Sequence, residues 1–409
     1  MFPRLLRAFS THAAASKPST STVAVTGSSG YIGSSFVVSE LDRRFLRAFS
    51  TAASTASKQS TVAVTGSSGY IGSFVVSELL DRGYKVHCPI RGSTENPGKA
   101  EHLLKHPNAA NLTIFDGGDL SKKGSFDEAF ASADAVIHTA AQVDLGEDES
   151  IITDSVEGTK NVLSSVDKSP GVKRFVQTSS VAAIQKYNVP PGYVFTERDW
   201  NDWSTVANGD AYGVAKTTAE KLVHSHFASS DGRSAAAVNP GVVIGPVMNR
   251  SHTKASAYFL YACIMGKKAM NFPATFVDVR DVAAGHVNAL ESLPSIHGGR
   301  FLLVNDDGCV ESGPLGLGEI ASEKFPEYRF DIKPLYPEHI MKFARPLSML
   351  PIVGHKIMNE YQRLAQSTPV QFDNKTTKEK LGLEFRPLDV TVKEGIESII
   401  ENGLAEFKK

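Results

Sequence analysis

The stretch TVAVTGSSGYIG, from Thr61 to Gly72, decides the fold class of this chain. Its first five residues are valine, alanine and threonine, and this β-branched run predicts a short strand over residues 61–65. The segment SFVVSELLDRG that follows carries apolar residues at helical spacing and ends on Gly83, so it predicts a helix. A strand, a glycine turn and a helix in this order predict the first unit of a parallel sheet covered by helices.

Gly66, Gly69 and Gly72 stand three residues apart between that strand and that helix. Gly66 permits the tight turn, Gly69 lets the backbone approach a pyrophosphate, and Gly72 lets the helix pack closely. The helix N-terminus adds free N–H groups and the positive end of its dipole. Glycine turns without ligands are common, so the prediction of a dinucleotide site depends on the place of this turn after the opening strand of a long α/β pattern.

The same letters occur once before, from Thr22 to Gly33, together with a repeated leader, RLLRAFST at residues 4–11 and RFLRAFST at residues 44–51. After Gly33 the chain has room for one helix and then enters the second leader, so no second strand follows. A ligand site at a switch point needs neighbouring strands. We therefore expect the second copy to bind the ligand. The alternative is that residues 22–26 dock as an extra edge strand.

The chain beyond residue 60 alternates short apolar runs with amphipathic stretches. This alternation predicts further strands at residues 85–90, 112–115, 135–138, 174–177 and 235–238, and hence a Rossmann doubly wound parallel sheet of the α/β class. The alternation weakens later in the chain. We expect a leader with a partial duplicate at residues 1–59, a Rossmann domain at 60–245, and a smaller substrate-binding lobe at 246–409 with segments that return to the sheet.

Composition excludes several classes of function. The chain has 409 residues, 41% hydrophobic and 21% charged, which are values typical of globular proteins with a sizeable core. A formal net charge of -1 and the lack of a long basic run argue against nucleic acid as a partner. No apolar run is long enough to span a bilayer. The 3 cysteines and 12 histidines show no metal-binding spacing, so no metal site is predicted. The oligomeric state is not predicted.

The N-terminus carries no acidic residue before Glu40, and Phe2, Leu5, Leu6 and Phe9 fall on one helical face. An amphipathic leader that is rich in arginine and serine is typical of a mitochondrial presequence, with a plastid peptide as the weaker option. The alternative is a disordered terminus on a cytoplasmic protein.

The predicted second strand ends in His87-Cys-Pro-Ile-Arg91-Gly92. NAD-selective sites usually place an acidic residue there to bond the ribose hydroxyls, whereas arginine suits a 2′-phosphate. Arg91 therefore predicts NADP(H) rather than NAD(H) as the cofactor. The alternative is an ordinary exposed loop arginine.

Tyr212 and Lys216 lie four residues apart in DAYGVAKTTAE and would share one face of a helix. A nearby ammonium favours the ionised phenolate and so suits the tyrosine to general acid-base work. This spacing is frequent by chance and usually marks a solvated face. Here it follows a predicted strand that runs into Ser179-Ser180, and the Ser180 hydroxyl could hold a substrate oxygen.

The motifs TGxxGYIG, GDL, HTAA, TSS, YxxxK and NPGVVxGP occur in this order, and from about Thr61 onward the chain resembles an extended short-chain dehydrogenase/reductase. The dihydroflavonol reductase and cinnamoyl-CoA reductase branch is the most similar. The resemblance implies that Ser180, Tyr212 and Lys216 are catalytic. It also implies a set of residues that line the cofactor: Gly66, Ser68, Gly69, Tyr70, Ile71, Gly72, Arg91, Asp119, Leu120, Thr139, Ala140, Tyr212, Lys216, Pro240, Val242 and Val243.

The sequence departs from both plant reductases at positions that bear on the substrate. Cinnamoyl-CoA reductases resemble NWYCYGK around the catalytic tyrosine, where this chain reads Asp210-Ala-Tyr-Gly-Val-Ala-Lys216. Dihydroflavonol reductases typically have asparagine five residues after the catalytic serine, where this chain has Gln185. We predict an NADPH-dependent carbonyl reductase of a small organic substrate. The alternatives are a nucleotide-sugar epimerase or dehydratase with bound NAD, and a non-catalytic dinucleotide sensor.

Overall fold

The computed structural model describes residues 60–335 and 370–405, except for 142–149, 188, 191, 230–231, 266–267, 271–272, 311–312, 329 and 331–332. The chain divides into two units, residues 1–59 and 60–409, and the described residues belong to the second. The first copy of the glycine turn, the predicted leader and the alternative edge strand at residues 22–26 lie outside the described residues.

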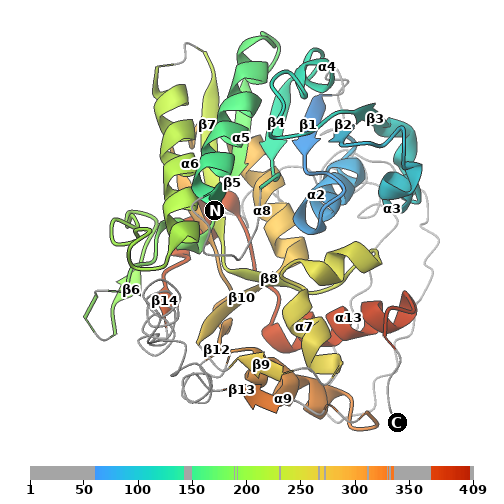
Figure 1. Ribbon diagram of the computed structural model, residues 1–409, viewed down its shortest axis with the longest axis vertical. Helices are drawn as coiled ribbons and strands as arrows, with labels where there is room; N and C mark the ends of the chain where they lie inside the picture. The colour runs from blue at the N-terminus through green and yellow to red at the C-terminus, as the bar shows by residue number, and fades with distance from the viewer. Residues whose placement is uncertain are drawn as a thin grey trace, which may run out of the picture. The chain divides into compact units, whose positions relative to one another are not determined.

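The central sheet has seven parallel strands in the order β11-β7-β5-β4-β1-β2-β3. Their bounds are β1 (Thr61–Thr65), β2 (Lys85–Ile90), β3 (Leu112–Asp116), β4 (Ala135–His138), β5 (Arg174–Thr178), β7 (Ser234–Pro240) and β11 (Arg300–Leu303). From β1 the chain moves outward to β2 and β3, and then returns to the other side of β1 at β4 (Figure 1). The strand order therefore reverses between β1 and β4, where doubly wound sheets bind their ligands.

Helices cover both faces of this sheet, and the alternation of side chains along β1 explains why. Val62 and Val64 join the cluster formed with α2 (Tyr70–Asp81) and α8 (Val279–Ser292), whereas Ala63 faces the cluster that includes α5 (Ser150–Asp167) and α6 (Ala211–Ala228). A strand buried on both faces needs apolar residues at every position. The structure therefore confirms the predicted fold class, a Rossmann-like α/β fold with a parallel central sheet.

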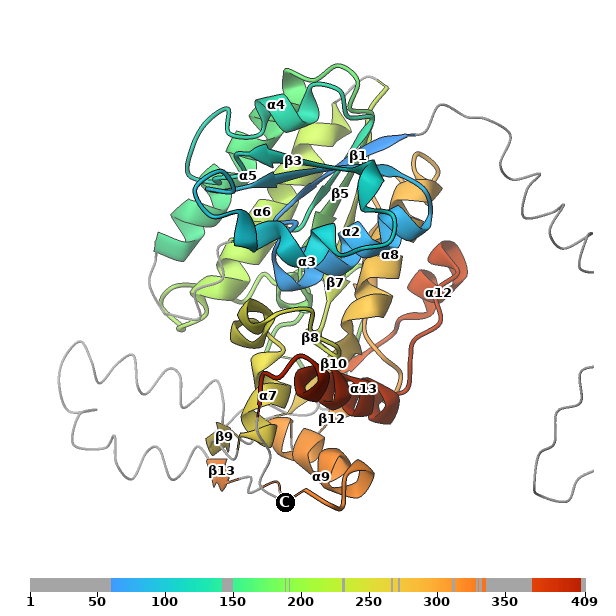
Figure 2. The same cartoon turned by 90° about the vertical axis from the view of Figure 1, so that its right-hand side faces the viewer.

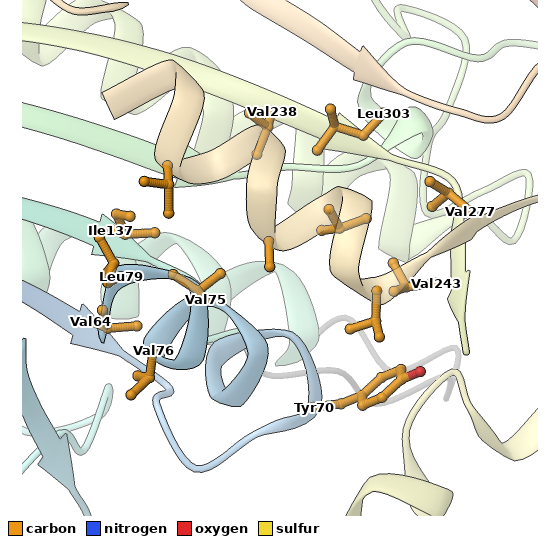
Figure 3. Close-up of a cluster of buried hydrophobic side chains, with 14 of the residues drawn as sticks. Val64, Tyr70, Val75, Val76, Leu79, Ile137, Val238, Val243, Val277 and Leu303 are labelled. Atoms are coloured by element: carbon orange, nitrogen blue, oxygen red, sulfur yellow. The ribbon is translucent and has the colours of Figure 1, made fainter. Parts of the chain in front are cut away.

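The hydrophobic core next to the glycine turn contains side chains from the central sheet and from the segment that follows β7. Figure 3 shows Val64, Val75, Ile137 and Val238 in one cluster with Val243, and all five side chains are at most 4% exposed. Burying a valine or isoleucine side chain of this kind stabilises the fold by roughly 1.5–3 kcal/mol. The turn between β1 and α2 thus rests on a packed core.

A smaller group of elements follows β7 along the chain (Figure 2). It contains the three-stranded sheet β12-β10-β8 and the pair β13-β9. Its strands are β8 (Val242–Ile244), β9 (Lys268–Met270), β10 (Ala274–Asp278), β12 (Cys309–Val310) and β13 (Lys333–Leu335). Its helices are η5 (Arg250–Lys254), α7 (Tyr258–Ile264), α9 (Pro314–Lys324) and α13 (Leu388–Glu401). Because β8 comes directly after β7, this group is attached at the carboxyl edge of the central sheet.

The remaining elements are short connections. They are η2 (Pro97–Ala100), α3 (Glu101–Leu104), η3 (Ala109–Asn111), α4 (Asp127–Phe130), η4 (Val181–Ala183), the pair β6 (Val194–Phe195) and β14 (Gln371–Phe372), and α12 (Lys375–Leu381). Among the described residues, no helix has the length and apolar character needed to cross a membrane.

Two elements differ from the sequence prediction. The helix after the glycine turn begins at Tyr70, three residues before the predicted segment, because Tyr70 to Gly72 of the glycine motif already form its first helical turn. The strand predicted at residues 235–238 continues as β7 through Asn239 and Pro240, where it pairs with β11. Proline has no N–H to donate. The parallel pairing of β11 with β7 tolerates Pro240, because the N–H of the next residue, Gly241, donates to Leu303 O at 3.1 Å. β11 comes from the segment beyond residue 246 and completes the sheet.

Candidate active site

The glycine turn needs glycine at two positions because of its own backbone. Gly66 has φ +67°, and a Cβ there would lie 2.8 Å from Ala140 N. A Cβ on Gly72 would lie 2.1 Å from Gly66 O, well inside contact distance. Both positions therefore exclude larger residues in the described fold, whether or not a ligand binds.

Gly69 is under less steric constraint from the described residues than Gly66 or Gly72. Its φ of -79° is ordinary, and a Cβ would contact only Gly66 O, at 3.1 Å. Gly69 is exposed at the N-terminus of α2, a helix with no side-chain cap and no acidic residue in its first turn. Uncapped N–H groups and an open surface are what a pyrophosphate needs at a helix N-terminus. The turn fits a dinucleotide.

The ends of β1 and β4 are tied together beside this turn. Thr139 Oγ1 donates to Thr65 O at 2.7 Å, and Ala140 N–H donates to Thr65 Oγ1 at 3.2 Å. Gly66 lies against the same two residues. The structure thus brings Thr139 and Ala140 next to the glycine turn at the point where the strand order reverses.

Arg91 follows the last residue of β2, and its side chain is 73% exposed. Its Nη1 atom lies 4.0 Å from Asp119 Oδ1. The Ser121 hydroxyl donates to Asp119 and lowers the pKa of that carboxyl, and Arg91 acts in the same direction. Arg91 therefore offers an exposed guanidinium at the carboxyl edge of β2, where a 2′-phosphate would lie.

Lys99, in η2, is a second cation at this edge that the sequence did not indicate. Its Nζ donates to Arg91 O at 2.6 Å and would lie 3.2 Å from a Cβ on Gly92. The loop from Gly92 to Thr94 is held by Asp116, whose pKa is lowered by bonds from the Thr94 side chain and from backbone N–H groups. The fold of this loop brings Lys99 back to Arg91.

Several other residues of the predicted cofactor set lie in or against the core. Tyr70 is 5% exposed, and its ring meets the Phe74 ring edge to face at a centroid distance of 5.9 Å. Val243 is 4% exposed and lies beside Tyr70 (Figure 3). The remaining members are Ser68, Ile71, Leu120 and Val242, which are half-buried, and Pro240, which is buried. The side chains of Tyr70 and Val243 therefore pack in the hydrophobic core next to the glycine turn.

Tyr212 and Lys216 lie near the start of α6, with Lys216 Nζ 5.9 Å from the centre of the Tyr212 ring. The Asp210 side chain caps this helix by accepting from Gly213 N–H at 3.0 Å. A Cβ on Gly213 would lie only 2.4 Å from Asp210 Oδ2. The start of the helix is thus fixed by tight packing, and Tyr212 is fixed with it.

Lys216 also lies near the end of β4. Burial lowers the pKa of His138, the last residue of β4, to about 3, and the charge of Lys216 contributes to the same shift. His138 Nδ1 lies 2.7 Å from Thr65 Oγ1. The lysine of α6 therefore reaches the same edge of the sheet as the glycine turn.

Ser180 comes two residues after the end of β5 and caps η4, where its Oγ accepts from Ala182 N–H at 3.1 Å. η4 packs against α6. Ser180 and Tyr212 are both half-buried and belong to these two adjoining elements. The structure thus brings the three predicted catalytic residues to the carboxyl edge of the central strands.

Trp200 and Trp203 pack against other side chains. The Arg300 guanidinium lies 3.7 Å from the centre of a Trp200 ring, and the Trp203 and Tyr187 rings meet at 5.1 Å. Within the described ranges no group of three or more histidine, cysteine, aspartate or glutamate side chains is placed to hold a metal ion.

Comparison with known proteins identifies the family. The sequence model of the NAD dependent epimerase/dehydratase family matches residues 62–303. A cinnamoyl-CoA reductase of Medicago truncatula is 30% identical over 334 residues, covering 80% of this chain and 91% of that protein. A dihydroflavonol 4-reductase of Arabidopsis thaliana is 30% identical over 316 residues, covering 75% of this chain and 70% of that protein.

Two solved structures are similar over most of this chain. Gre2 of Candida albicans in complex with NADPH is 26% identical, with a TM-score of 0.65, and the match covers 84% of this chain and 99% of that one. Yeast methylglyoxal/isovaleraldehyde reductase Gre2, complexed with NADPH, is 25% identical with a TM-score of 0.65, covering 83% and 98%. These findings confirm the predicted class, an NAD(P)-dependent oxidoreductase. Since the family match spans more than half of the chain and both plant reductases align over most of their own length, the chain belongs to the NAD dependent epimerase/dehydratase family, in the branch of extended short-chain reductases that its motifs resemble.

Proposed function

We propose that this protein is an NADPH-dependent reductase of a small organic carbonyl compound. The observation that carries the proposal is the placement of Tyr212, Lys216 and Ser180 at the same sheet edge as the glycine turn. A proton donor, its neighbouring cation and an oxygen-holding hydroxyl beside a dinucleotide turn suit hydride transfer to a carbonyl.

The cofactor is NADP(H), which both solved relatives named above bind. In this chain Arg91 and Lys99 supply two positive groups within one loop, and no acidic residue follows β2 directly. A charged group that pairs with a phosphate contributes more than one that pairs with a neutral hydroxyl. The 2′-phosphate of NADPH therefore binds here better than the free ribose hydroxyl of NADH.

The three catalytic side chains have different roles in this reaction. NADPH, when bound at the glycine turn, would supply the hydride that the carbonyl carbon accepts. Tyr212 donates its hydroxyl proton to the carbonyl oxygen, and Ser180 donates a hydrogen bond that holds that oxygen. The Lys216 ammonium stabilises the phenolate that remains on Tyr212 and would also hold the nicotinamide ribose of a bound cofactor.

Two rival functions make different predictions. A nucleotide-sugar epimerase would retain NAD through the reaction, and Arg91 in place of an acidic residue disfavours that cofactor. A non-catalytic dinucleotide sensor would have no use for Ser180, Tyr212 and Lys216 together.

The proposal is tested by offering the full chain NADPH together with a panel of aliphatic and aromatic aldehydes, α-ketoaldehydes, ketones and thioesters. We expect NADPH oxidation that depends on at least one carbonyl substrate and is much slower with NADH. NADPH binding without turnover across the panel would favour a sensor. Interconversion of nucleotide sugars, offered with NAD in a parallel assay, would favour the epimerase.

A further inference from the structure

α6 presents a third polar side chain in line with the two proposed catalytic ones. Tyr212, Lys216 and Glu220 are spaced four residues apart, so they follow one stripe of the helix. Glu220 differs from the other two because its side chain is 0% exposed. A buried charge is costly unless the protein surrounds it with partners, so the partners of Glu220 show what this charge does.

Three side chains donate to the Glu220 carboxylate within hydrogen-bond distance, and His224 Nε2 lies 3.6 Å from Oε1. Asn239 Nδ2 donates to Oε2 at 2.8 Å, the Ser179 hydroxyl donates to the same oxygen, and Arg300 Nε donates to Oε1. Burial acts to raise the pKa of Glu220. Hydrogen bonds from His224, Arg300 and Ser179, together with the charge of Arg300, outweigh burial and hold the pKa below its usual value. Glu220 is therefore an ionised carboxylate.

The same partners also hold the backbone around Ser180. Ser179 is its neighbour in the chain, and Asn239 Nδ2 donates to Ser180 O at 3.1 Å as well as to Glu220. Arg300 Nη2 donates to Ala183 O at 3.2 Å, at the end of the short helix that Ser180 caps. The carboxylate is thus connected to residues on both sides of Ser180.

Arg300 is itself fixed from several directions. Its guanidinium lies 3.7 Å from the centre of a Trp200 ring, and Nη1 donates to Glu197 O at 2.9 Å and to Asp199 O. Arg300 begins β11 and pairs with Ala237 of β7, two residues before Asn239. The cation is held by sheet pairing, by the ring and by carbonyl groups, so it cannot follow a displaced carboxylate freely.

We propose that Glu220 is a positioning residue that sets the distance between the Ser180 and Tyr212 hydroxyls. It fastens α6, which carries Tyr212, to the segment from Ser179 to Ala183, which carries Ser180. The proposal rests on the proposed function, in which Ser180 and Tyr212 hold and protonate one carbonyl oxygen. Glu220 acts through Ser179, Asn239 and Arg300 rather than on the substrate.

The test is Glu220→Gln in the wild-type and Ser180→Ala backgrounds. Glutamine keeps the shape but removes the charge that holds Arg300. A displacement of about 1 Å at a reacting centre costs on the order of a hundredfold in rate, so we expect kcat to fall by roughly tenfold to a hundredfold. The Kd of NADPH should stay within about twofold, because the cofactor turn is untouched. In the Ser180→Ala background, Glu220→Gln should cause almost no further loss, because residues that act as a unit are not additive.

The control is Asp281→Asn, which alters another buried carboxylate, 1% exposed and paired with Arg386, at the start of α8. We expect it to lower the free energy of unfolding while kcat stays unchanged. If Glu220→Gln does not fold, Ser179→Ala is the alternative variant. It keeps the ion pair between Glu220 and Arg300 and removes the hydrogen bond from the Ser179 hydroxyl to Glu220. It should lower kcat by about threefold to tenfold and again cause no further loss in the Ser180→Ala background.

The positioning role is wrong if Glu220→Gln keeps the wild-type kcat, or if it lowers kcat by the same factor with and without Ser180. It is also wrong if Asp281→Asn lowers kcat as much, because the effect would then follow from lost stability alone. A wild-type protein that binds NADPH and reduces no carbonyl overturns the proposed function, and the positioning role with it.

Discussion

Lys216 Nζ lies 5.9 Å from the centre of the Tyr212 ring, one turn further along α6. Burial is the main cause of the low pKa of His138 at the end of β4, and the charge of the same ammonium is the second cause. Lys216 therefore lies near both the proposed proton donor and the strand that borders the proposed cofactor site. Its charge can act on the tyrosine and on the cofactor together.

Replacing Lys216 should impair chemistry and cofactor binding at once. We expect Lys216→Met to lower kcat by roughly a hundredfold or more, because the phenolate left on Tyr212 loses its stabilising charge. Lys216→Arg should retain more activity than Lys216→Met, since it keeps the charge. Steady-state kinetics with NADPH check this, and equal kcat values for the wild type and the methionine variant would refute the role.

NADPH should bind more tightly than NADH because of Arg91 and Lys99. Charge-assisted bonds of this kind contribute about 1.5–3 kcal/mol, so Arg91→Ala should weaken NADPH binding by about tenfold to a hundredfold. NADH binding should change little. Lys99→Ala should have the same sign of effect, and Lys105→Ala, an exposed lysine paired with Glu101, is the control. Equal affinities for the two cofactors that Arg91→Ala leaves unchanged would contradict this account.

The second copy of the glycine turn should be the one that binds. Among the described residues, Gly66 O alone lies within 4 Å of a Cβ at Gly69, at 3.1 Å, so Gly69→Val should keep the fold and block the approach of a pyrophosphate. Gly30→Val makes the same change in the first copy and is the matched control. Fluorescence titration with NADPH should show lost binding for Gly69→Val only. Lost binding in Gly30→Val would place the first copy in the site.

Acidification should destabilise the protein through three buried histidines. Burial lowers the pKa of His138 to about 3 and the pKa values of His252 and His286 to about 4. An unfolded histidine has a pKa of about 6.5. Between these values the unfolded state binds more protons, so the free energy of unfolding falls as the pH is lowered, by up to about 1.4 kcal/mol per pH unit for each histidine.

Urea unfolding at about pH 5.5 and about pH 7.5 measures this dependence, in a range above the titration of most carboxylates. His286→Gln should reduce the pH dependence, because one of the histidines with a lowered pKa is removed. A free energy of unfolding that is flat or rises on acidification would show that these histidines are charged in the folded protein.

Local patterns in the sequence were enough for the first strand, the glycine turn and the pairing of Tyr212 with Lys216 on one helix. Each depends on residues within one turn or one strand. Lys99 could not be found in this way, because only the fold of the loop after β2 returns it to Arg91. Tyr70 and Val243 stand in motifs of cofactor-binding proteins, but their side chains pack in a core that local patterns do not reveal.

Glu220 is the clearest case of information that is not local. Its spacing from Lys216 was visible in the sequence, and an exposed glutamate is the usual outcome at such a position. Its burial depends on Arg300, which is 80 residues away and belongs to a strand that the sequence pattern did not indicate. A long-range ion pair of this kind follows from sheet pairing between β7 and β11.

The central claim is that Tyr212 protonates a carbonyl oxygen beside bound NADPH. The most direct measurement is kcat for Tyr212→Phe, with the carbonyl substrate that the wild type reduces fastest, together with the Kd of NADPH. Removal of a proton donor costs roughly a hundredfold to ten-thousandfold in rate, whereas the lost hydroxyl makes little contact, so kcat should fall by that factor and Kd should stay within about twofold. A variant that keeps more than half of the wild-type rate would contradict the account.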